Sequence, residues 1–112
     1  MNGVKKTGDP RKFETGAQRD SGTGKPRMSL VPHCALYGLM DRFLTGAEAY
    51  GENNWRLGMK HSVLYDSAMR HLMADFTGDA SEPHLEAALW NICCMIQMRA
   101  EHPELDDRED FC

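Results

Sequence analysis

The chain has 112 residues, of which 41% are hydrophobic and 27% charged, ordinary values for one soluble globular domain. No apolar run approaches the roughly 18 residues needed to cross a bilayer, and no apolar stretch follows the N-terminal lysines. These features argue against a membrane protein and a secretory signal, so we expect a cytoplasmic protein.

Charge is unevenly distributed along the chain. Residues 1–27 carry a net charge of +4, whereas the remaining residues carry −8. The first segment is polar and glycine-rich and shows neither helical nor strand periodicity, so it predicts an extended basic arm. A basic arm on an acidic body suits an anionic ligand held beside metal-binding carboxylates, but a solvated tail would have the same composition.

Three amphipathic segments follow the arm, and each has the three-and-four spacing of a helix. We expect helices over Leu30–Tyr50, Ser62–Phe76 and Glu82–Glu101, with Ser81 as the N-cap of the third. Their predicted core rows are Leu36, Met40, Phe43, Ala47 and Tyr50, then Leu64, Ala68, Leu72 and Phe76, then Leu85, Leu89, Ile92 and Ile96. Asn91 should be partly buried and must then find a hydrogen-bond partner.

No strand pattern is visible, so the predicted fold is all-α, an antiparallel helical bundle with an extended N-terminal arm. We expect a helical domain over residues 28–102 and an acidic, frayed tail over 103–112. The helices carry apolar residues on more than one face. Because such a small core is often completed by self-association, we expect a homodimer or homotetramer.

The cysteines and the connector before the second helix carry less information. Cys34, Cys93, Cys94 and Cys112 show no CxxC pair, so they predict neither a zinc site nor a disulfide framework, and Cys93 and Cys94 fit small core residues. Trp55, in the polar connector, either closes the core from outside or stacks on a flat ligand. The first role is favoured.

Carboxylates near the helix ends are the chemical feature of the sequence. They are Asp41, Glu48, Glu52, Asp66, Asp75, Asp79, Glu82 and Glu86. Oxygen ligands of this kind hold Mg²⁺ or Mn²⁺ in helical bundles, although most acidic stripes are solvated helix faces. His71 and His84 fit hydrogen-bonded structural residues as well as ligands or bases.

Four stretches, taken in order, carry a resemblance. They are GKPRMSLVP (Gly24–Pro32), GAEAYGENNW (Gly46–Trp55), SVLYDSAMRHL (Ser62–Leu72) and GDASEPHLEAALWN (Gly78–Asn91). Over about residues 13–107 the chain resembles the phage-type dATP/dGTP diphosphohydrolase domain. That group includes the MazZ enzymes of phages with 2-aminoadenine in their DNA and is related to the MazG-like all-α NTP pyrophosphohydrolases.

The resemblance implies an oligomeric, MazG-like helical bundle that converts a purine deoxynucleoside triphosphate, dGTP or dATP, to its monophosphate and pyrophosphate with Mg²⁺ or Mn²⁺. In a MazZ setting the enzyme would act in the host cytoplasm, where dGMP feeds 2-aminoadenine nucleotide synthesis. The broader superfamily uses an E-x-x-E pair followed by E-x-x-D. Here the nearest forms are Glu48/Glu52, spaced by four, and Asp79/Glu82.

Residue roles follow from the resemblance. It implies Glu48 and Glu52 as catalytic residues, with Glu52 activating water. The implied metal ligands are Glu48, Glu52, Asp66 and Asp79. The implied phosphate-binding residues are Lys25, Arg27 and Arg70, and Asn54 and Trp55 would frame the base or sugar.

Three alternatives remain open. A catalytically inactive helical module would bind no metal. A phosphohydrolase acting through Arg70 and His71 would release phosphate rather than pyrophosphate. A nucleic-acid-binding protein using the basic arm is disfavoured, because the −8 body would repel DNA phosphates.

Overall fold

A computed structural model describes residues 8–109, so residues 1–7 of the predicted arm, residues 110–112 of the predicted tail and Cys112 lie outside the described part. The chain forms two compact units, one ending at Val31 and one beginning at Pro32, which are described separately. Within the described residues, none of the helices combines the length and the apolar character needed to cross a membrane.

The N-terminal unit contains a short hairpin where the sequence predicts an arm without secondary structure. Strand β1 (Arg11–Lys12) pairs antiparallel with β2 (Gln18–Arg19). The amide of Phe13 donates to the carbonyl of Ala17 at 2.9 Å, which closes the turn. Strands of two residues are too short to show an alternating pattern, so sequence periodicity could not reveal them. A 3-10 helix, Met28–Leu30, follows.

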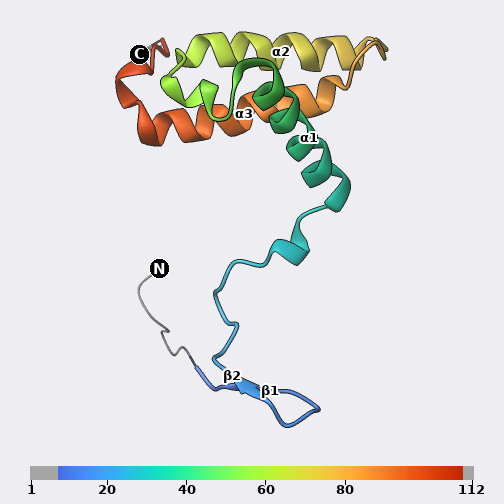
Figure 1. Ribbon diagram of the computed structural model, residues 1–112, viewed down its shortest axis with the longest axis vertical. Coiled ribbons are helices and arrows are strands. Elements are labelled where there is room, and N and C mark those ends of the chain that lie inside the picture. The colour runs from blue at the N-terminus through green and yellow to red at the C-terminus, as the bar shows by residue number, and fades with distance from the viewer. Residues whose placement is uncertain (1–7, 110–112) are drawn as a thin grey trace. The chain divides into compact units, whose positions relative to one another are not determined.

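The second unit is helical and confirms the all-α prediction. Its helices are α1 (His33–Tyr50), α2 (His61–Phe76) and α3 (His84–Glu101). Helices α2 and α3 lie side by side and antiparallel, and α1 crosses them and packs on α3 (Figure 1). Helix α1 begins after Pro32, three residues later than predicted, because residues 28–30 form the separate 3-10 turn.

The start of α3 differs from the prediction. Pro83, not Ser81, precedes its first residue, and the amide of Ser81 donates instead to Oδ1 of Asp79 at 2.8 Å. An aspartate that accepts from the amide two residues later forms a local turn, which competes with a helix N-cap.

The core is small and lies mainly between α2 and α3. Leu64, Cys94 and Met98 are its buried apolar centre, and buried Ala87 and Ala88 allow the two helices to approach closely. Asn91 is buried on the same face, and its Nδ2 donates to the carbonyl of Ala87 at 2.9 Å, as its position requires.

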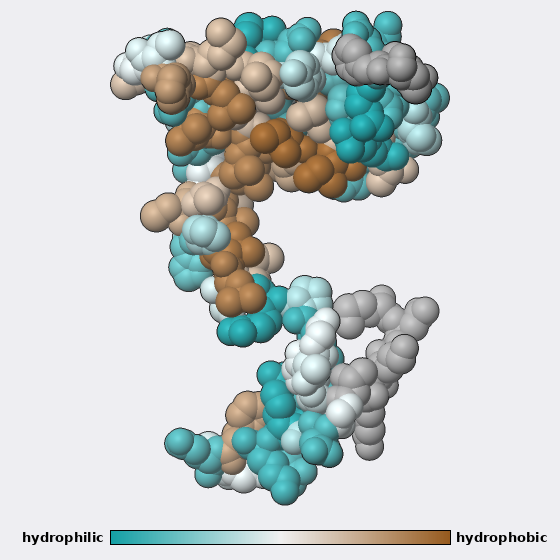
Figure 2. All heavy atoms as spheres, turned by 180° about the vertical axis from the view of Figure 1, so that it is seen from behind, coloured by the Kyte–Doolittle hydropathy of each residue, from teal (hydrophilic) through white to brown (hydrophobic). Residues whose placement is uncertain are grey.

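The predicted core row of α3 is wrong. Leu85, Ile92 and Ile96 are exposed, because the face with the smaller residues packs on α2. Phe76, at the end of the predicted α2 row, is 92% exposed. Figure 2 shows hydrophobic residues gathered over α1 and the adjoining surface of the helical unit. A single copy therefore leaves large apolar side chains uncovered.

One glycine sets the distance between α1 and α3. A Cβ at Gly38 would lie 2.5 Å from Cγ of Glu86, closer than side-chain atoms pack. The missing side chain lets α1 cross close to the N-terminal turn of α3.

The C-terminal segment is ordered over residues 102–109, contrary to the predicted fraying. Pro103–Leu105 form a 3-10 helix. Asp107 then accepts hydrogen bonds from both the amide and the hydroxyl of Ser62, which satisfies a free donor at the start of α2. One of the acidic residues that predicted a frayed tail, Asp107, therefore caps the start of a helix 45 residues earlier in the chain.

The cysteines provide a test of this packing. Burial raises the pKa of Cys94 to about 12, so its thiol stays protonated at neutral pH, whereas Cys34 is exposed. Iodoacetamide should alkylate Cys34 in the native protein and Cys94 only after unfolding, as measured by peptide mass mapping. Equal native labelling of the two would contradict the packing of α3.

Candidate functional site

A hollow of about 510 Å³ lies beside the C-terminal half of α1. Its aromatic wall is formed by Phe43 of α1, Trp55 of the connector and Trp90 of α3. The ring centroid of Phe43 lies 5.8 Å from that of Trp55 and 5.9 Å from that of Trp90. Tilted aromatic pairs at these distances are favourable and rigid. The hollow therefore offers flat apolar surface of the kind that a nucleobase stacks on.

The rim of this aromatic hollow is polar. It is formed by Glu52, Asn53 and Asn54, where α1 ends and the chain turns into a 3-10 helix, Asn54–Leu57 (η2). Asn53 adopts a left-handed conformation, φ 59°, which asparagine tolerates better than most residues. In addition, Nε1 of Trp90 is buried and has no hydrogen-bond partner among the described residues. Side chains that donate and accept hydrogen bonds thus surround an apolar wall.

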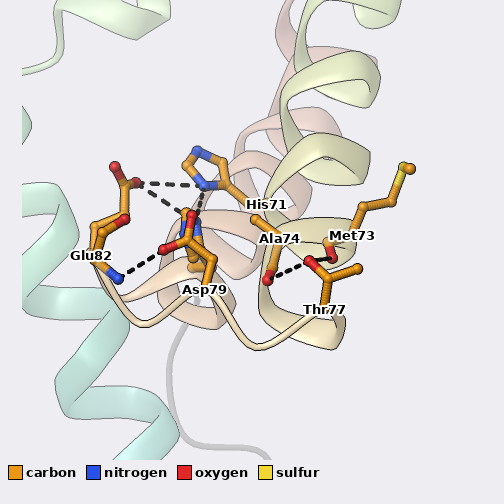
Figure 3. A network of polar contacts seen from close by, with 8 residues as sticks. His71, Met73, Ala74, Thr77, Asp79 and Glu82 are labelled. Atoms are coloured by element: carbon orange, nitrogen blue, oxygen red, sulfur yellow. Dashed lines mark hydrogen bonds and ion pairs between the residues drawn. The ribbon is translucent and has the colours of Figure 1, made fainter.

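A second group of polar residues gathers at the turn between α2 and α3. His71, Glu82 and His84 each offer a ligand atom, and these atoms all lie within 4.8 Å of one another. Nδ1 of His71 lies 2.9 Å from Nδ1 of His84 and 3.4 Å from Oε1 of Glu82. Figure 3 shows Glu82 turned toward His71, and Oδ2 of Asp79 lies 3.3 Å from Nε2 of His84. We call His71, Asp79, Glu82 and His84 the His–carboxylate cluster.

Local structure holds this cluster in place. The hydroxyl of Thr77 donates to the carbonyls of Met73 and Ala74 and so closes the last turn of α2. The amide of Asp79 donates to the same Ala74 carbonyl at 3.0 Å. The antiparallel α2–α3 pair brings the end of one helix to the start of the next, which places His71 opposite His84.

Burial and hydrogen bonding set the charges of the cluster. Burial, together with the nearby positive charge of Arg42, lowers the pKa of His71 despite the opposing effect of Glu82. Hydrogen bonds from Ser81 hold the pKa of Asp79 below its ordinary value. Nε2 of His84 is buried and lies 3.3 Å from Oδ2 of Asp79 without an aligned hydrogen bond in the described residues. The cluster therefore combines an ionised carboxylate with a nitrogen atom that lacks a satisfied partner.

These donors fit a divalent transition metal ion. Two imidazoles and the carboxylate of Glu82 form a mixed nitrogen and oxygen set, which Mn²⁺ and Zn²⁺ accept, whereas Mg²⁺ prefers oxygen ligands. Asp79 lies beside Nε2 of His84, so it would orient this ring from its other nitrogen. A solvent-open recess of about 600 Å³ borders Asp79, Glu82 and His84. That recess leaves room for water or a phosphate group beside a bound ion.

Helix α3 connects the two sites. Glu86 borders the recess at the cluster and Trp90 lines the aromatic hollow. These residues are four apart, so they lie on one face of the helix, about 6 Å apart along its axis. Helix α1 spans the same stretch, because Gly38 contacts Glu86 and Phe43 contacts Trp90.

The structure brings together some of the predicted site residues. Glu52, Asn54 and Trp55 share the aromatic hollow, and Asp79 belongs to the His–carboxylate cluster. Arg70 is exposed on α2, next to His71 in the sequence. Glu48 on α1 and Asp66 on α2 are exposed and line neither site as described. Lys25 and Arg27 are exposed in the N-terminal unit.

Sequence analysis missed the partnership of His71, Glu82 and His84, whose roles it left open. The available signal was their position, since each lies near the turn that joins two antiparallel helices. It also treated Phe43 as a core residue. Trp55 closes the core from outside, as the favoured alternative predicts, because it packs against the core cluster, and it also lines the hollow.

Comparison with known proteins identifies one family. The family model described as "dATP/dGTP diphosphohydrolase, N-terminal" matches residues 15–108. The match includes every residue of both sites. No curated protein and no solved structure is detectably similar to the chain.

The aromatic wall should be a main source of stability for α1. Phe43→Ala should lower the free energy of unfolding by roughly 2–4 kcal/mol, because the side chain packs on two indoles but is only partly buried. Its neighbour Leu44 is 57% exposed, so Leu44→Ala should cost less than about 1 kcal/mol. Urea unfolding followed by circular dichroism measures both, and equal costs would contradict the assigned packing.

Proposed function

Because the chain belongs to the dATP/dGTP diphosphohydrolase N-terminal family, we propose that it hydrolyses a purine deoxynucleoside triphosphate, dGTP in the first place, to the monophosphate and pyrophosphate. The observation that carries this proposal is that α3 contributes to both sites, through Trp90 to the aromatic hollow and through His84 to the His–carboxylate cluster. One site suits a nucleobase and the other suits metal-bound phosphates, so together they suit one nucleotide.

The base would lie in the aromatic hollow. Trp55 and Trp90 supply stacking surface. Guanine presents N1–H and an amino group, which require an acceptor. Glu52 lines the hollow and carries two acceptor oxygens, so we assign it to the guanine edge, with Asn54 beside the base or sugar.

The phosphates would lie at the cluster. His71, Glu82 and His84 are the residues that would hold the divalent ion, for which the donor set favours Mn²⁺ over Mg²⁺, and Asp79 would orient His84 from its Nε2 side. A bound ion there would neutralise the phosphate oxygens and the leaving pyrophosphate. Arg70 on α2 and Arg42, whose charge acts on His71, are nearby cations for the same purpose.

The reaction needs one water and no redox partner. Water attacks the α-phosphorus, the bond from that phosphorus to the bridging oxygen of the β-phosphate breaks, and pyrophosphate leaves. The proton of the water passes to a base, for which a carboxylate oxygen of Glu82 is the candidate. In a MazZ-like setting the product dGMP would feed 2-aminoadenine nucleotide synthesis. A nucleotide-binding module without catalysis is the second candidate, supported by the exposure of both sites.

Hydrolysis is tested by product analysis with a panel of nucleoside triphosphates and Mn²⁺ or Mg²⁺. We expect dGMP and pyrophosphate, faster with Mn²⁺. Glu82→Gln should lower kcat/KM by about 100-fold or more, because it removes a carboxylate from the reacting centre. Glu14→Gln, an exposed acid in the N-terminal hairpin, is the matched control and should behave as wild type.

Three results would change this assignment. Full activity of Glu82→Gln would remove the cluster from the reaction. If Glu48→Gln lost hydrolytic activity while Glu82→Gln kept it, the ligand set implied by the sequence resemblance would be supported instead. Binding of the nucleotide without any product would support the non-catalytic module.

We also propose that the chain works as a homodimer or homotetramer. The support is the set of large apolar side chains that a single copy leaves exposed on all three helices, including Leu44, Met73, Phe76 and Ile96. Light scattering coupled to size exclusion should give a mass two or four times the 12.7 kDa of one chain. A 12.7 kDa particle at working concentration would contradict self-association.

A further inference from the structure

A short C-terminal segment, His102–Asp107, is fastened to the connector between α1 and α2. We call it the strap. Nε2 of His102 lies 2.7 Å from the carbonyl oxygen of Arg56, and Leu105 packs on Gly58 so closely that a Cβ there would lie 2.7 Å from its Cδ1. Gly58 also has φ +118°, a conformation that favours glycine. Asp107 anchors the far end of the strap at Ser62.

The connector has two sides with different roles. Asn53, Asn54, Trp55 and Met59 line the aromatic hollow. Arg56 and Gly58, which lie between Trp55 and Met59, are the residues that the strap holds. The strap therefore contacts the connector at residues next to those that form the wall of the hollow.

His102 is the polar element of this attachment. Its Nε2 faces a carbonyl oxygen and its Nδ1 lies 3.0 Å from Oε1 of Glu104. Both neighbours are acceptors, so both ring nitrogens must carry a proton for both bonds to form. A neutral ring can make only one of the two.

We propose that His102 is a positioning residue: as an imidazolium it holds the connector in the conformation that forms the aromatic hollow, and its deprotonation loosens that wall. The consequence for nucleotide binding rests on the proposed function. The effect on the connector does not, because it concerns the protein without ligand.

The surroundings of His102 support the direction of this switch. The hydrogen bond to the carbonyl of Arg56, and then the one to Glu104, raise the pKa of His102 above its ordinary value. Since the folded-state pKa is raised, the stabilisation is complete below about pH 6.5, the unfolded value, and is lost as pH rises through the folded pKa. The charged and titratable groups around the ring are Arg56, His61, Arg99, Glu101, Glu104 and Asp106.

One of these groups needs its own control. His61 is buried behind the strap, and the guanidinium of Arg99 donates to its Nε2 at 3.2 Å. A pH effect must therefore be assigned to His102 by substitution. His33, exposed at the start of α1, offers a matched histidine whose loss should leave the connector unchanged.

Amide hydrogen exchange of the full chain without ligand tests the proposal. In wild type and in His33→Gln, the protection factor of the Arg56–Gly58 amides should fall at least about tenfold as pH rises from about 6 to about 9. In His102→Gln it should be low throughout, with helical circular dichroism retained. The proposal would be overturned if the amides of His102→Gln were as protected as those of wild type, or if their protection kept the pH dependence of wild type.

Glu104→Gln provides a second test that does not remove the ring. It keeps an acceptor but removes the negative charge, so the loss of protection should move to lower pH. An unchanged midpoint would overturn the role of the imidazolium. Binding of α,β-imido-dGTP with Mn²⁺ should weaken over the same pH range in wild type but not in His102→Gln. If exchange responds as expected and this nucleotide does not bind, the proposed function fails while the role of the strap stands.

Discussion

The contact of Phe43 with Trp55 and Trp90 determines the arrangement of the helical unit. One ring from α1 packs on one indole from the connector and on another from α3. Because this contact joins three segments, it seats α1 across α3 and forms the wall of the hollow at the same time. Stability and ligand binding therefore depend on the same side chains, and a substitution in any of the three segments would alter both.

The size of the core explains why both candidate sites are open. Leu64, Cys94 and Met98 are the buried centre of a unit of about 80 residues, and the face of α3 that covers α2 is built largely from alanine and other small residues. Small residues bring two helices close but bury little area. The larger apolar residues remain outside, where a second copy would cover them. The sites lie at the ends of this short core, at the α2–α3 turn and at the connector, where loop residues such as Asp79, Glu82 and Asn54 join helix residues in supplying the polar groups.

Periodicity predicted the three helices and the all-α fold, because helical spacing is a local property of the sequence. It did not decide which of two apolar faces of α3 is buried, since the choice between the Leu85–Ile96 row and the Ala87–Met98 face depends on the partner helix. The resemblance named Glu52, Asn54 and Trp55, which line one hollow, although it implied a catalytic and metal-binding role for Glu52. The cluster of His71 with Glu82 and His84 was not predicted, because it arises only when two helices fold back on each other. The strap contacts join residues about 46 positions apart, which no local pattern reveals.

The central claim is that one nucleotide occupies both the aromatic hollow and the His–carboxylate cluster. A crystal structure of the full chain with Mn²⁺ and α,β-imido-dGTP tests it most directly. We expect guanine against the aromatic wall beside Trp55 and Trp90, with the ion on His71, Glu82 and His84 and in contact with the triphosphate. A triphosphate held by Glu48 and Asp66, with the cluster free of metal, would contradict it.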